Sequence, residues 1–198
     1  MLKLVRADPT QTGETRARQA PSLTRVWDPL VRLLHWGLVA SFATAWFTAR
    51  TAEDLHYAAG YMAAGLILVR LAWGFGGTRY ARFGQFIRSP VAVLGYLNDI
   101  RLGRERRHIG HNPAGAAMVL ALMATMVVAA FSGWMMTTDT WFGDDTVQAV
   151  HSLDVHVMLL LIAAHIGGVL LASLRHHENL IRAMITGHKR APEGDDVG

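Results

Sequence analysis

The sequence contains no cysteine, which excludes disulfide bonds, thiolate-bound iron–sulfur clusters and covalent cofactor attachment through a C-x-x-C-H motif. Charged residues are scarce at 17%, and the first twenty residues contain no apolar run, so no cleavable signal peptide is expected. The 198 residues are instead 52% hydrophobic, and the apolar residues are gathered in long blocks. This composition predicts a membrane protein in which any redox centre is held by ligands other than thiolates.

Four apolar blocks are long enough to cross a bilayer as helices, which takes about 20 residues each. Asp28-Pro29 and Asn112-Pro113 each place an N-cap residue before a proline, which predicts where two of these helices begin. The predicted spans cover residues 31–49, 55–75, 114–136 and 150–174. We therefore expect an all-α membrane protein, a bundle of four transmembrane helices. Residues 25–190 would form its one domain, between a flexible cytoplasmic tail (1–24) and a second tail (191–198).

Two further segments have the apolar stripe that is typical of a short helix lying on the membrane surface. The first begins at Ser89-Pro90 and ends at Gly103, which is a favourable residue for a helix end. The second follows the last span, over residues 180–185. Both are predicted as interfacial helices.

The distribution of basic residues predicts the orientation of the bundle. With alternating spans, the N-terminal tail, the connection 78–112 and the C-terminal tail share one side. That side holds 18 of the 19 Lys and Arg residues, if the side chains of Arg32 and Arg70 extend to it from within their spans. The exception is Arg50. The positive-inside rule therefore places both termini in the cytoplasm. Because topology accounts for the basic excess, no nucleic-acid partner is expected.

Four histidines of the predicted spans fall at two depths. His151 and His165 lie fourteen residues apart on the last span. That spacing returns to within about 40° of the same helix face and separates the residues by about 21 Å along the axis. In the predicted topology His56 lies at the depth of His151, and His35 lies near the depth of His165. Ionisable side chains inside a membrane are costly and usually functional, so we expect two cross-helix pairs, His56 with His151 and His35 with His165.

Paired imidazoles that project into the core of a helix bundle can hold a metal or a haem. Two neutral imidazoles suit the two axial positions of a haem iron. Because the chain has no cysteine, noncovalent b-type haem is the natural cofactor. The sequence thus predicts two haems, one for each pair.

Other uses of these histidines stay open. A single histidine in a membrane is equally suited to a hydrogen bond with a neighbouring helix. A zinc site would need three or four ligands at one depth, and a proton relay would include carboxylates, of which Asp154 is the nearest. His156 lies nine residues from His165, about 180° around the helix, so we do not expect it to be a ligand.

Three further groups of residues have alternative uses: arginines at the inner ends of the spans, a glycine near His56 and the histidines outside the spans. Arg32, Arg70 and Arg175 could pair with haem propionates or anchor to lipid, and lipid is favoured. Gly60 follows His56 by one helical turn, where it could admit a flat macrocycle or a neighbouring helix. The histidines of the basic cytoplasmic segments are expected to be solvated or to lie at headgroups: His108, His111, His176, His177 and His188.

Several stretches together resemble the prokaryotic cytochrome b561 superfamily, and within it the cytochrome b subunit of nickel-dependent hydrogenases. They are VWDPLVRLLHW, RLAWGFGGTRYARF, IGHNPAGAAM, the H-x13-H spacing on the last span and ENLIRAMITGHKR, and they lie within residues 25–190. The resemblance implies a four-helix bundle in the bacterial inner membrane with two bis-histidine b haems. It places the ligands at His35, His56, His151 and His165.

The resemblance implies electron transfer between a periplasmic redox protein and the quinone pool, with quinone as substrate and no catalytic side chain. Hydrogenase-type subunits often have a longer connection between the first two helices than residues 50–54 provide. The periplasmic partner is therefore expected to be a hydrogenase-like enzyme or a cytochrome c. Whether the chain itself acts as a quinone reductase or quinol oxidase stays open. Two alternatives to electron transfer stay open: a membrane anchor for a redox partner, and a histidine-based proton or metal transporter.

Overall fold

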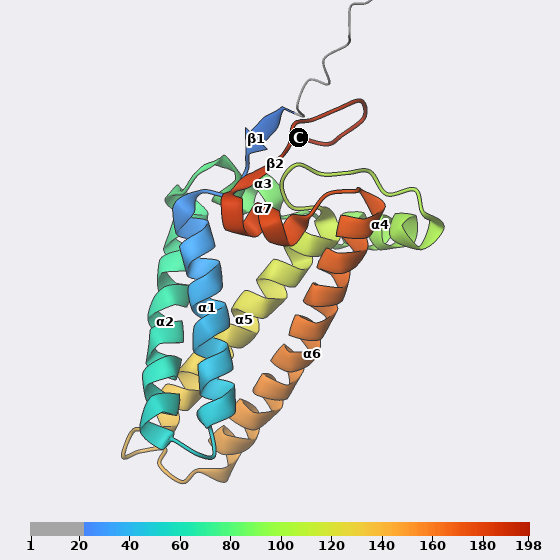
Figure 1. Cartoon of the computed structure of the whole chain (residues 1–198). Coiled ribbons are helices and arrows are strands. Elements are labelled where there is room, and N and C mark those ends of the chain that lie inside the picture. Colours follow the sequence, from blue (N-terminus) through green and yellow to red (C-terminus); the bar gives the residue numbers. More distant parts are fainter. Residues whose placement is uncertain (1–21) are drawn as a thin grey trace, which may run out of the picture.

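Four long helices lie side by side in the computed structural model, which describes residues 22–198 (Figure 1). They are α1 (Pro29–Thr48), α2 (Glu53–Gly76), α5 (Pro113–Met136) and α6 (Asp145–Arg175). Each is long and apolar enough to cross a membrane. The predicted all-α fold with four membrane spans is confirmed. Of the predicted N-terminal tail, residues 1–21 lie outside the described part of the chain.

Three of the four long helices, α1, α5 and α6, begin at a side chain that accepts a backbone N–H group. Asn112 Oδ1 accepts from the Gly115 N–H at 2.7 Å, and Asp28 Oδ1 accepts from the Val31 N–H at 2.9 Å. Both predicted helix starts are thereby confirmed. Helix α6 begins five residues before its predicted span because Asp144 caps it, accepting from the N–H groups of residues 146 and 147. A hydropathy pattern does not include such a polar first turn.

Asp28 also joins the start of α1 to the end of α2. Its Oδ2 accepts from Trp73 Nε1 at 3.2 Å and from Thr78 Oγ1 at 2.5 Å. Burial of the carboxylate opposes ionisation, but the hydrogen bonds outweigh burial and hold the pKa of Asp28 below its usual value. One N-cap residue therefore also fixes how two membrane helices meet.

Short elements form a layer over the end of the bundle that is uppermost in Figure 1, called here the upper layer. It contains β1 (Leu23–Arg25), η1 (Arg79–Ala81), α3 (Phe83–Phe86), α4 (Pro90–Leu102), α7 (Leu180–Thr186) and β2 (His188–Arg190). Helices α4 and α7 confirm the two short helices predicted from apolar stripes, and Gly103 ends α4 with a positive φ of 66°. On α4, Val91 is 79% exposed and Leu94 is 67% exposed, so part of its apolar stripe is uncovered. Its position on a membrane surface stays a prediction.

The two strands of the upper layer bring together segments from opposite ends of the chain. β1 and β2 pair antiparallel, with Leu23 opposite Arg190. β1 thus begins within the segment predicted as the N-terminal tail. Strands of three residues are too short to show an alternating pattern in the sequence, so neither strand was predicted.

The segment predicted as a C-terminal tail, residues 191–198, folds back onto the connection between α4 and α5. The Val197 N–H donates to the Arg107 carbonyl, and the Ile109 N–H donates to the Val197 carbonyl, each at 2.9 Å. The Asp196 carboxylate forms an ion pair with the Arg107 guanidinium. The last residues therefore belong to the upper layer.

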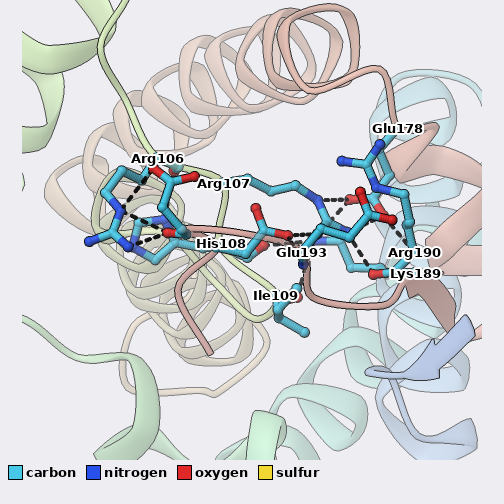
Figure 2. Close-up of polar contacts among 10 residues, drawn as sticks. Arg106, Arg107, His108, Ile109, Glu178, Lys189, Arg190 and Glu193 are labelled. Carbon is cyan, nitrogen blue, oxygen red and sulfur yellow. Dashed lines mark hydrogen bonds and ion pairs between the residues drawn. The ribbon is translucent and has the colours of Figure 1, made fainter. Parts of the chain in front are cut away.

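Four charged side chains form a buried cluster in this layer, called here the ionic cluster: Arg107, Glu178, Lys189 and Asp196. The first three are labelled in Figure 2. Arg107 Nη2 lies 2.7 Å from Glu178 Oε1, and Lys189 Nζ lies 3.6 Å from Glu178 Oε2. Burial opposes ionisation of Glu178, but hydrogen bonds from Arg107 and the charge of Lys189 hold the pKa of Glu178 below its usual value. The cluster links the α4–α5 connection to the turn after α6 and to β2.

The expectation that His111 is solvated or at a headgroup is wrong. Its side chain is enclosed between the rings of Trp27 and Phe86, at centroid distances of 4.7 and 4.6 Å. Burial lowers the pKa of His111 to about 3, so the ring is neutral. A connection rich in basic residues is typical of a solvated loop, whereas here the upper layer folds over it.

The expectation that the three arginines anchor to lipid is also wrong for Arg70, which is buried. Arg70 is 7% exposed, donates to the Ala81 carbonyl at 3.3 Å and lies 5.6 Å from the centroid of the Phe83 ring. Arg175 forms an ion pair with Glu105 at 2.6 Å. The third, Arg32, donates to the carbonyl of Ile185 on α7. These guanidinium groups hold the upper layer onto the bundle.

Candidate functional site

The four histidines of the spans lie in two pairs, in the combination predicted from their depths. His35 on α1 and His165 on α6 have ring centroids 6.5 Å apart. His56 on α2 and His151 on α6 have ring centroids 6.4 Å apart. α1 starts and α6 ends at the upper layer, so His35 and His165 form the upper pair and the other two form the lower pair (Figure 1).

The spacing within each pair suits two ligands on opposite sides of one metal ion. A metal–imidazole bond is about 2.0–2.1 Å, and half a ring adds about 1.1 Å, so trans imidazoles have centroids about 6.3 Å apart. The observed centroid distances are 6.5 and 6.4 Å. Among residues 22–198, no group of three or more His, Asp and Glu side chains could hold a metal ion. Each pair therefore fits a metal that brings its other ligands with it, as haem iron does.

Hydrogen bonds orient both rings of the lower pair. His56 Nδ1 lies 2.8 Å from the Ala45 carbonyl oxygen, and His151 Nδ1 lies 3.0 Å from Ser132 Oγ. A carbonyl oxygen can only accept, so Nδ1 of His56 carries the proton and its Nε2 has a free lone pair. Metal-binding histidines usually have such a partner on the second nitrogen. This arrangement leaves Nε2 of His56 free to bind a metal.

The upper pair is held differently. Nδ1 of His35 is buried and has no hydrogen-bond partner among the described residues. Its ring packs edge-on against Trp36 at a centroid distance of 5.0 Å. Packing therefore orients His35, whereas hydrogen bonds orient His56 and His151.

His156 and Gly60 are the two remaining positions of interest near the pairs. His156 is exposed, and its Nδ1 donates to the Ser152 carbonyl at 2.6 Å. The centroids of its ring and the Trp46 ring are 6.1 Å apart. A Cβ added to Gly60 would meet nothing within 4 Å, so Gly60 does not serve close helix packing. The open space at Gly60, one turn from His56, suits a flat group beside the lower pair.

Sequence reasoning missed Ser132, which contacts His151 from a different helix. The two residues are separated by 19 positions. A serine in an apolar span carries no signal that identifies its partner, since helical phase predicts which residues share a face and not which side chains meet across an interface.

The chain is similar to known proteins over most of its described length. The chain matches the family model described as "Prokaryotic cytochrome b561" over residues 26–187. A "Probable Ni/Fe-hydrogenase B-type cytochrome subunit" of Rhizobium leguminosarum bv. viciae is 22% identical over 170 residues, covering 72% of this chain and 70% of the relative. Proteins with the same description are 26% identical in Bradyrhizobium diazoefficiens (68% of this chain, 65% of the relative) and 22% identical in Cupriavidus necator (92% and 94%). No solved structure matches the chain.

Proposed function

Because the chain belongs to the prokaryotic cytochrome b561 family, we propose that it carries electrons across a membrane through two b-type haems, one on each histidine pair. Family membership implies a membrane cytochrome with b-type haem. That there are two haems, and that the four histidines bind them, goes beyond what family membership implies. The observation that carries them is the centroid distance of 6.5 Å in one pair and 6.4 Å in the other, which suits bis-histidine ligation twice.

The side chains have distinct tasks in this proposal. His35 and His165 hold one haem, and His56 and His151 hold the other. The haems supply the one-electron chemistry. The four helices set the direction of each imidazole and keep water from the ligands, and the hydrogen bonds on Nδ1 adjust the strength of the ligand. No side chain needs to react covalently.

The two ends of the bundle are proposed to serve different partners. The basic residues gathered at the upper layer support a cytoplasmic position for both termini. The lower pair would then exchange electrons with a periplasmic redox protein, and the upper pair with membrane quinone. The curated relatives are described as hydrogenase subunits, which supports a hydrogenase-like partner. Because only residues 49–52 separate α1 from α2, a small partner such as a cytochrome c is the second candidate.

Haem content of the purified protein tests the proposal directly. The wild type should show a reduced-minus-oxidised spectrum of b-type haem and two haems per chain. His165→Ala removes one ligand of the upper pair and should reduce the content to one haem per chain. His35→Ala should give the same result because it removes the opposite ligand of the same haem.

His156→Ala is the matched control, since His156 lies on the same helix as His165. Its side chain contacts Ser152 and Trp46, which belong to neither histidine pair. It should retain both haems. Two haems in the His165→Ala protein would contradict the pairing, and a wild type without b-type haem would contradict the function. Rapid re-oxidation of the reduced protein by a soluble quinone analogue would support the quinone part of the proposal.

A further inference from the structure

Ser132 is one of the few buried polar side chains of the bundle, and it contacts a proposed ligand. It lies on α5, which contributes no histidine to either pair, and is 4% exposed. Its Oγ is 3.0 Å from Nδ1 of His151. The third span, which has no ligand of its own, therefore still reaches the lower pair.

The hydroxyl proton of Ser132 is already used within α5. Ser132 Oγ lies 2.7 Å from the Val128 carbonyl oxygen and 3.2 Å from the Ala129 carbonyl oxygen, and both of these atoms can only accept. A hydroxyl has one proton, so its lone pairs face His151. Nδ1 of His151 must then donate to Ser132, which leaves Nε2 of His151 as the free ligand nitrogen.

The next residue of α5 gives the ring its space. A Cβ added to Gly133 would lie 3.3 Å from Cε1 of His151, closer than ordinary van der Waals contact. Glycine at 133 thus lets the imidazole lie against α5, where Ser132 can reach it. Two adjacent residues of α5 set the position and the protonated nitrogen of one ring.

We propose that Ser132 is a positioning residue for the lower haem, which it influences through His151. By accepting the Nδ1 proton it fixes the tautomer and makes the imidazole a more basic ligand. A more basic ligand favours the oxidised iron, so Ser132 lowers the reduction potential of the lower haem. The upper haem lacks this support on one side, because Nδ1 of His35 is buried without a partner among the described residues. The inference rests on the proposed function, since it requires haem on the lower pair.

Potentiometric titration of the purified protein, followed by optical spectroscopy, measures the effect. In Ser132→Ala one of the two haem components should become easier to reduce, with a change in its reduction equilibrium on the order of tenfold, about 59 mV for one electron. The other component should not move. Ser132→Thr retains the hydroxyl and should restore the original potential.

Thr125→Ala is the matched control on the same helix. Thr125 also donates to carbonyls of its own helix, at 3.2 Å to Ala121 and 3.1 Å to Leu122, and it has no histidine partner within residues 22–198. It should leave both potentials unchanged. If Ser132→Ala loses the lower haem, recovery in Ser132→Thr supports the inference and failure to recover contradicts it.

Unchanged potentials in Ser132→Ala with two haems bound would overturn the role of Ser132 and leave the proposed function intact. Equal shifts of both components, or the same shift in Thr125→Ala, would also overturn it. A wild type without haem would instead contradict the proposed function itself.

Discussion

Glu178 is the shared anion of the ionic cluster, so replacing it tests what holds the upper layer to the bundle. Its carboxylate lies 2.7 Å from Arg107 Nη2 and 3.6 Å from Lys189 Nζ, and it accepts the Arg190 N–H at 2.8 Å. Glu178→Gln keeps the shape of the side chain and an acceptor for the Arg190 N–H. It removes the negative charge from a side chain that is 8% exposed.

Removing one partner of a buried ion pair costs about 3–5 kcal/mol, because the other charge is left buried without compensation. Here Asp196 still faces Arg107, so we expect the lower end of that range, about 3 kcal/mol. Lys189 would keep only its hydrogen bonds to the carbonyls of His108 and Ile109, each at 3.0 Å. For a chain of this size such a loss corresponds to a fall in Tm of about 6–12 °C.

Thermal denaturation in detergent, followed by circular dichroism, measures this difference. The control is Asp99→Asn, which breaks an exposed ion pair with Arg104 in the same layer, at 3.8 Å and with side chains 46% and 66% exposed. An exposed pair contributes about 0–1 kcal/mol, so the control should change Tm by less than about 4 °C. Equal Tm values for the two variants would refute the argument that burial makes the ionic cluster stabilising.

Acidification and the loss of an N-cap should also weaken the upper layer. Burial lowers the pKa of His111 to about 3, so the unfolded chain, with a histidine pKa of about 6.5, binds more protons between these values. The free energy of unfolding should therefore fall as the pH drops below about 6.5, by up to about 1.4 kcal/mol per pH unit. The carboxylates of the ionic cluster have lowered pKa values and should add to the loss below about pH 4. Tm measured from pH 7.5 to 4.5 should show the first decrease, and His111→Asn should flatten it; a flat wild-type profile would contradict the assignment. Asp28→Ala removes the cap of α1 together with the bonds from Trp73 and Thr78, so it should cost at least the 0.5–2 kcal/mol typical of a lost N-cap (about 1–8 °C in Tm), whereas Asp28→Asn, which can still cap, should lose less.

The long helices and the histidine pairs could be predicted because both follow from local chain geometry. Apolar length identifies a span, and a residue such as Asp28 before a proline marks where one begins. Helical rise then gives the depth of each histidine, so the pairing of His35 with His165 needed only the alternating direction of the spans. The structure brings the same pairs together, at centroid distances of 6.5 and 6.4 Å. Ligation of haem by these histidines stays a prediction.

The upper layer could not be predicted because its contacts join residues far apart in the sequence. Arg107 and Glu178 are 71 positions apart, and the N–H of residue 197 bonds the carbonyl of Arg107. A basic segment looks the same in a sequence whether its charges are solvated or paired. That ambiguity explains the wrong expectation for His111. For Arg70, an arginine within an apolar span looks the same in a sequence whether it reaches lipid or, as here, the carbonyl of Ala81.

The sequence by itself determined the number of spans, their direction relative to one another and the depth at which each histidine lies, because these depend on hydropathy and on the fixed rise of a helix. Only the tertiary structure decided what surrounds each imidazole. Ser132 accepts from His151, the Ala45 carbonyl accepts from His56, and His35 has no such partner among the described residues. The rotation of each helix against its neighbours selects these contacts, and that rotation is set by the packing of all the helices together.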